Sequence, residues 1–223
     1  MGSLYLRIRS SLRVATSLAI AAAVAGQLQY LADNDLLNPV NFFSYFTMLS
    51  NVLACLMLVG LELRGGEPLG RFARWARGGV TLYMTMTGLI YAVLLAPIAA
   101  DVSTQLPWVN FVVHMAAPLV VFADWVLSAD APRVDARRAL LWLTFPVLWL
   151  GYTFVRGAIV DWYPYPFLDP RAGVEGAAGS WSAVIVTTVV MLLLVAGGAM
   201  VLRWLAGRLS GRAAAVTADN TSS

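Results

Sequence analysis

The chain contains 223 residues, of which 60% are hydrophobic and only 12% are charged, and its mean hydropathy is +0.73. This composition is too apolar for an ordinary soluble domain and predicts an all-α, polytopic membrane protein. The net charge of +3 and the pI near 9.3 do not indicate nucleic-acid binding, because the arginines gather at the ends of the predicted membrane spans.

Windows of about 19 apolar residues predict six transmembrane helices in a bundle. Their approximate ranges are 12–32, 41–61, 79–99, 108–128, 139–159 and 181–202. The first range is long for the apolar core of a signal peptide, so we expect a retained helix. Short connections predict a single membrane domain over residues 1–211, and the small polar residues 212–223 predict a disordered tail.

The basic residues predict the orientation of the bundle. Thirteen of the fifteen lie before the first span, between the second and third, between the fourth and fifth, or after the sixth. All of these positions fall on one side of a six-span protein, so the positive-inside rule places both termini in the cytoplasm. We expect an integral protein of a bacterial plasma membrane.

The second predicted helix carries a stripe of polar residues. Asn41, Ser44, Thr47, Ser50 and Asn51 recur at intervals of three, three, three and one residue, which places them on one helical face. Polar side chains within a bilayer are expected to face other protein rather than lipid. The sequence therefore predicts that this face lies against another helix of the bundle.

The fourth predicted helix contains His114, the only histidine of the chain, with Asn110 one turn before it and Pro118 one turn after. An ionisable ring in hydrocarbon is costly unless it faces a protein interior, which makes it a candidate for function. His114 and Thr47 both lie about six residues from the outer ends of their spans, or roughly 9 Å deep at about 1.5 Å per residue. Their side chains can therefore meet.

A hydroxyl beside an imidazole can perform nucleophilic acyl transfer, with neutral histidine accepting the hydroxyl proton during attack. A structural explanation is also open. Threonine commonly bonds to its own helix, and the ring of His114 can donate to a carbonyl and hold helices together. The residues alone do not decide between the two.

The fifth predicted helix carries Arg156 near its outer end. Its planar guanidinium can bind a substrate carboxylate. The structural alternative, which we favour, is that it extends to the interface or pairs with Asp161 or Asp169. The segment that follows, DWYPYPFLDP, combines aromatic residues, prolines and carboxylates and predicts a structured cap at the outer interface.

Three segments resemble the androgen-induced and androgen-dependent TFPI-regulating membrane proteins, a family of six-span threonine hydrolases of fatty acid esters of hydroxy fatty acids. YFTMLSNVL around Thr47, the spacing of Trp108, Asn110, His114 and Pro118, and WYPYPFLDP over 162–170 carry the resemblance. It implies Thr47 as the nucleophile and His114 as the general base. Phe111 and Met115 replace a histidine and a threonine of the animal relatives, so the chain is more similar to an actinobacterial branch.

The resemblance does not identify the group that stabilises the oxyanion. Asn110 and Asn51 are candidates, because an amide donor in a dry cavity stabilises developing negative charge strongly. Both amides can equally serve to join helices.

The sequence therefore favours a carboxylic ester hydrolase that acts on acyl-ester lipids from the membrane. It contains no GxxxxGK[ST], CxxC, HExxH or GxSxG pattern and only one histidine, so we expect neither a metal nor an organic cofactor. The main alternative is a non-catalytic protein that binds lipid or transports a small solute through the same polar cavity. A structural subunit of a larger complex is a second alternative, and the protein partners are unknown.

Overall fold

The computed structural model describes residues 3–96, 106–128, 134–172 and 179–221. Every regular element within these ranges is a helix, and six of the helical segments are long and apolar enough to cross a membrane. The predicted all-α, polytopic membrane bundle is therefore confirmed, and the protein is an integral membrane protein.

Several of the six spans are built from more than one element. The first three comprise α1 (Ser3–Asp33), α2 (Pro39–Ser44) with α3 (Phe46–Leu63), and α4 (Arg71–Ile90) with the π-helical turn η1 (Tyr91–Leu95). The fourth comprises α6 (Pro107–Phe111), the π-helical turn η3 (Val112–Ala116) and α7 (Ala117–Val126). The last two comprise α8 (Ala136–Leu140), η4 (Leu141–Leu143) and α9 (Thr144–Val160), and then α10 (Trp181–Thr221).

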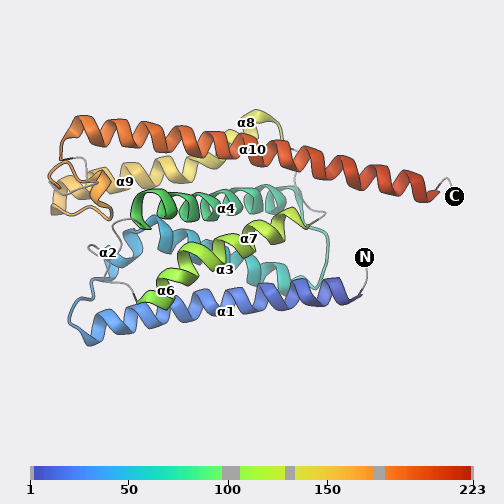
Figure 1. Cartoon of the computed structure of the whole chain (residues 1–223), viewed down its shortest axis with the longest axis horizontal. Coiled ribbons are helices and arrows are strands. Elements are labelled where there is room, and N and C mark those ends of the chain that lie inside the picture. Colours follow the sequence, from blue (N-terminus) through green and yellow to red (C-terminus); the bar gives the residue numbers. More distant parts are fainter. Residues whose placement is uncertain (1–2, 97–105, 129–133, 173–178, 222–223) are drawn as a thin grey trace.

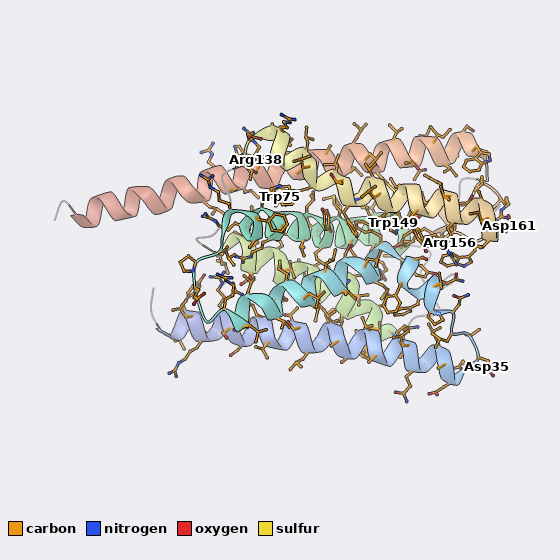
Figure 2. All side chains as sticks on the ribbon, turned by 180° about the vertical axis from the view of Figure 1, so that it is seen from behind. Asp35, Trp75, Arg138, Trp149, Arg156 and Asp161 are labelled. Carbon is orange, nitrogen blue, oxygen red and sulfur yellow. The ribbon has the colours of Figure 1, made fainter. Side chains whose placement is uncertain are left out.

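The helices pack side by side with both termini at one end of the bundle (Figure 1). Helix α1 packs against α3 and α7, α4 packs against the same two helices, and α10 packs against α4 and α8. We call the end with the termini the termini end, and the opposite end, which holds α2 and residues 161–172, the loop end. In Figure 2, Trp75 and Arg138 lie toward the termini end, and Arg156 and Asp161 lie at the loop end.

The second span is interrupted at Tyr45, which is extended (φ −69°, ψ 128°). The prediction of one helix over 41–61 is therefore wrong in detail, because α2 ends at Ser44 and α3 begins at Phe46. A distant side chain satisfies the backbone at this break, since the indole Nε1 of Trp149 donates to the Ser44 carbonyl at 2.9 Å. The carbonyl that the break leaves without a helical partner is therefore satisfied. The break places Thr47 in the first turn of α3.

The fourth span widens around His114. The N–H of Ala117 bonds to the carbonyl of Val112, five residues back, and Val112–Ala116 form the π-helical turn η3. Pro118 follows directly; it lacks an N–H, and its ring would collide with the carbonyl of residue 114 in a regular α-helix. We attribute the wide turn to this proline.

The last helix extends further than the sequence predicted. Residues 212–221 continue α10 as far as Thr221, where we expected a disordered tail. This stretch includes three consecutive alanines, and alanine has the highest helix propensity. Adding residues to an existing helix also avoids the cost of nucleation.

A cluster of buried ion pairs joins three helices at the termini end. Asp124 on α7 accepts from Arg9 and Arg13 on α1, each at 2.8 Å, and from Arg77 on α4 at 2.6 Å. Asp124 is only 6% exposed and Arg77 only 2%. Asp124 therefore has three cationic partners in the interior of the bundle.

Candidate functional site

Thr47 and His114 meet in the interior near the loop end. Thr47 Oγ1 lies 3.2 Å from His114 Nε2, and both side chains are buried. Their elements, α3 and η3, are neighbours in the bundle. The contact that was expected from equal depth is therefore present, and it has the geometry of a hydroxyl bonded to a potential general base.

A second hydroxyl, that of Tyr165, also reaches Thr47. Tyr165 Oη lies 3.2 Å from Thr47 Oγ1 and accepts the backbone N–H of Thr47 at 3.3 Å. The first N–H groups of a helix have no partner within it, and the preceding residue, Tyr45, provides no side-chain cap. Tyr165 thus occupies the position where the N-terminus of α3 attracts an electron-rich oxygen.

The imidazole of His114 is held from two directions. Its Nδ1 lies 3.3 Å from the carbonyl oxygen of Asn110, one turn earlier. The ring of Tyr91 in η1 stacks on it, with centroids 4.1 Å apart and planes 18° apart. Both stacked rings belong to π-helical turns, which often occur at functional sites. The ring is therefore fixed in position and orientation.

These contacts define the direction of each hydrogen bond around a neutral His114. The carbonyl of Asn110 can only accept, so the proton of the ring lies on Nδ1 and Nε2 is the acceptor. Thr47 must then donate to Nε2, which leaves its oxygen to accept from Tyr165. Tyr165 accepts in turn from the Thr47 N–H. Each N–H or O–H group in this set of bonds therefore has one acceptor. The hydroxyl proton of Thr47 points at His114 Nε2 and is oriented for transfer to it.

The two asparagines that were candidate oxyanion donors make other contacts. Asn51 Nδ2 donates to the carbonyls of Thr47 at 2.9 Å and Val113 at 3.0 Å, which uses both amide protons. Asn110 donates to the hydroxyl of Tyr91, the ring that stacks on His114. Asn51 thus joins α3 to η3, and Asn110 holds the Tyr91 ring that stacks on His114.

Arg156 lies outside this group of residues. It donates to Asn41 Oδ1 at 2.5 Å, and its guanidinium lies 4.9 Å from the centre of the Trp162 ring. The expected partners Asp161 and Asp169 bind Arg171 instead, at 2.5 and 3.2 Å. Arg156 therefore has the structural contacts that we favoured, although with different partners.

Tyr165 is the residue of this site that the sequence analysis missed. It belongs to the segment after α9, where Tyr165, Phe167 and Leu168 are buried and Pro166–Leu168 form the short helix η5. The expected structured cap is present, and it extends a tyrosine into the bundle. Burial raises the pKa of Tyr165 to about 12, against the lowering effect of its hydrogen bonds with Thr47. Its hydroxyl therefore keeps its proton at neutral pH.

Thr47 and Tyr165 open onto a cavity bounded by α3, α4, η1, α9, α10 and the 161–172 segment. The cavity contains about 570 Å³ of space between protein atoms, part of it open to the surroundings. Four of the lining residues, Thr47, Thr87, Tyr91 and Tyr165, carry hydroxyl groups, and the other lining residues are apolar or aromatic. Its largely apolar and aromatic lining suits the apolar part of a lipid-like molecule.

No group of three or more potential metal-ligating side chains occurs within the described ranges. Comparisons of the chain with protein-family models, with curated proteins and with solved structures returned no match. The features that bear on function are therefore the geometry of Thr47, His114 and Tyr165 and the cavity beside them.

Proposed function

We propose that the protein is an intramembrane carboxylic ester hydrolase with Thr47 as the nucleophile and His114 as the general base. The observation that carries the proposal is the 3.2 Å approach of Thr47 Oγ1 to His114 Nε2 at the wall of an apolar cavity. The resemblance of the segments around both residues to the androgen-induced family agrees with it. The protein would act in a bacterial plasma membrane with both termini in the cytoplasm.

The reaction proceeds in two halves. Thr47 Oγ attacks the ester carbonyl carbon, the π electrons of the carbonyl move to its oxygen, and His114 Nε2 takes the threonine proton. Collapse of this intermediate re-forms the carbonyl and expels the alcohol, which receives the proton from His114. Water then attacks the acyl-threonine with His114 as base, and a second collapse releases the carboxylic acid and returns the proton to Thr47.

The composition of the cavity wall favours a neutral acyl ester as the substrate. An acyl chain gains free energy in proportion to the apolar area that it removes from water, and the lining offers aromatic and aliphatic contacts. Arg156, whose guanidinium could bind a free carboxylate, instead contacts Asn41 and Trp162. A fatty acid ester of a hydroxy fatty acid belongs to this substrate class, provided that its carboxylate stays outside the cavity.

The alternative of a binding or transport protein predicts a different arrangement of polar groups. In that case His114 and Arg156 should converge on one ligand. His114 is instead bound to Thr47 and Asn110, and Arg156 is bound at the loop end. The hydrogen-bonded threonine is better explained by acyl transfer.

Hydrolysis of ester lipids by the purified full chain tests the proposal. We expect Thr47→Ala to abolish turnover and His114→Ala to lower kcat by about 10²- to 10⁴-fold, the range for loss of a general base. Thr47→Ser should retain activity, because it keeps the hydroxyl. A fluorophosphonate probe should label Thr47 in the wild type, as located by mass spectrometry.

Ser50→Ala is the matched control, because it removes another buried hydroxyl from α3, one turn beyond Thr47. It should hydrolyse the ester at close to the wild-type rate. Equal turnover by the wild type, Thr47→Ala and His114→Ala would eliminate this dyad.

A further inference from the structure

We infer that Tyr165 is a catalytic residue whose hydroxyl, together with the backbone N–H of Thr47, binds the oxyanion formed when Thr47 attacks the ester. The inference rests on the proposed function and adds the stabilising group that neither asparagine supplies. It assigns the role to a residue of the loop that follows α9, far from both members of the dyad in the sequence.

The first argument is the position of the two donors. In hydrolases that use a hydroxyl nucleophile, the backbone N–H of the nucleophile itself commonly points at the developing oxyanion. Here the N–H of Thr47 has no partner within the first turn of α3 and donates to Tyr165 Oη at 3.3 Å. Tyr165 Oη is also 3.2 Å from the attacking oxygen. A substrate oxygen that enters between the N–H of Thr47 and Tyr165 Oη would accept from both groups.

The second argument is that attack releases the Tyr165 proton for the oxyanion. Before attack, Tyr165 donates to Thr47 Oγ1, because the threonine proton is directed at His114. When Thr47 Oγ1 bonds to carbon, its lone pair is used and it becomes a poor acceptor. The new oxyanion is attached to that same carbon and is the strongest acceptor available. The hydrogen bond that Tyr165 donates is therefore stronger in the transition state than before attack, and this difference is what accelerates a reaction.

A third hydroxyl-bearing residue, Thr87, also lines the cavity. Its buried hydroxyl has no hydrogen-bond partner among the described residues. A buried polar group without a partner costs free energy, which a polar atom of a ligand would recover if it reached this hydroxyl.

A purely structural role for Tyr165 as a cap of α3 makes a different prediction. A cap stabilises the folded protein equally with and without substrate, so its loss lowers the thermal stability but leaves the binding of tetrahedral adducts unchanged. An oxyanion donor contributes mainly to the tetrahedral, negatively charged state. The two roles therefore separate in the comparison of KM, kcat and the affinity for a tetrahedral adduct.

The test is Tyr165→Phe in the full chain, measured with an ester lipid and with a trifluoromethyl ketone of the same acyl chain. The ketone adds to Thr47 Oγ and forms an oxyanion without a leaving group. We expect kcat to fall by about 10²- to 10³-fold, the range for loss of one oxyanion donor, and the inhibition constant of the ketone to rise at least tenfold. KM should change by less than about threefold, since uniform binding is unaffected.

Tyr163→Phe is the matched control. It makes the same change two residues earlier in the same segment, and its ring packs beside Gly157 rather than at the cavity. Its kcat and ketone affinity should equal those of the wild type. If Tyr165→Phe does not fold, 3-fluorotyrosine at position 165 keeps the ring and makes the hydroxyl a stronger donor; it should alter kcat and ketone affinity more than the same residue at position 163.

The results that overturn the inference are distinct from those that overturn the proposed function. If the wild type is active and Thr47→Ala is not, but Tyr165→Phe retains wild-type kcat and ketone affinity, Tyr165 is not an oxyanion donor. A loss of stability with unchanged ketone affinity identifies it as a cap only. If the wild type and Thr47→Ala hydrolyse the ester equally, the proposed function itself fails.

Discussion

At the scale of single residues, each group around His114 has a defined geometric effect. Nδ1 is bonded to the Asn110 carbonyl, which directs Nε2 toward Thr47. Tyr91 covers one face of the ring, and the Asn110 amide holds the hydroxyl of Tyr91. A histidine held on several sides loses little conformational freedom when it acts as a base. Under the proposed function, Tyr91 and Asn110 should therefore influence the rate of ester hydrolysis.

Substitution of Tyr91 should separate the stacking of its ring from the hydrogen bond of its hydroxyl. Tyr91→Phe keeps the ring over His114 and should lower kcat by less than tenfold. Tyr91→Ala removes the stacked pair, which is worth about 0.5–1.5 kcal/mol, and should lower kcat about tenfold further. Rates at saturating ester, with the rate of fluorophosphonate labelling of Thr47, measure the effect. Equal rates for the two variants would show that stacking does not orient the histidine.

At the scale of elements, irregularities in three helices bring the site together. The break between α2 and α3 exposes the N–H of Thr47, and the π-helical turns η3 and η1 contain His114 and Tyr91. Helix α4 must also lie close to the fourth span, which requires a small residue at Gly88. A Cβ at Gly88 would lie 3.2 Å from the carbonyl oxygen of His114 and 3.3 Å from Cβ of Pro118.

Gly88→Ala should therefore push α4 away from η3 and α7. Overpacking of this kind costs about 1–3 kcal/mol, so we expect a lower Tm in detergent and a lower kcat, because the backbone of His114 moves. Gly60→Ala is the control, since a Cβ there meets nothing within 4 Å and alanine favours a helix. Its Tm should be unchanged or higher. An identical Tm for both variants would show that the close contact at Gly88 does not destabilise the alanine variant.

The sequence predicted most of the elements but not their interruptions. Hydropathy averaged over a span located all six membrane helices, and the polar stripe correctly brought Thr47 to the interior. The break at Tyr45 was missed because it depends on Trp149, a residue about a hundred positions away, which binds the freed Ser44 carbonyl. The helix ends also differed, as in α10, because a formed helix extends through residues of good helix propensity.

At the scale of the whole molecule, the buried ion pairs of Asp124 and the candidate site lie toward opposite ends of the bundle. Asp124 and its three arginines join α1, α4 and α7 at the termini end, whereas Thr47 lies near the loop end. A substitution in the Asp124 cluster should therefore change the stability of the bundle without changing the contacts of Thr47 and His114.

Asp124→Asn should reduce the stability of the bundle strongly without altering the chemistry of the folded fraction. It leaves the guanidinium groups of Arg9, Arg13 and Arg77 without their shared carboxylate, and loss of one partner from a buried pair costs about 3–5 kcal/mol. Thermal unfolding in detergent measures the loss, and the rate per folded molecule should stay near that of the wild type.

Asp161→Asn provides the comparison, because Asp161 binds Arg171 at the surface of the loop end with a side chain that is 81% exposed. Exposed pairs contribute little to stability, so its Tm should hardly change. A similar Tm for Asp124→Asn and Asp161→Asn would contradict a stabilising role for the buried cluster.

The amino-acid sequence by itself determined the membrane class, the six spans and the equal depth of Thr47 and His114. These properties follow from the apolar length of each segment and the rise of a helix, which are local quantities. The tertiary structure alone decided that Thr47 is at a helix N-terminus, that His114 is held by Tyr91, and that Tyr165 reaches Thr47. Each of these depends on the rotation and interruption of helices, which are set by contacts between residues far apart in the chain.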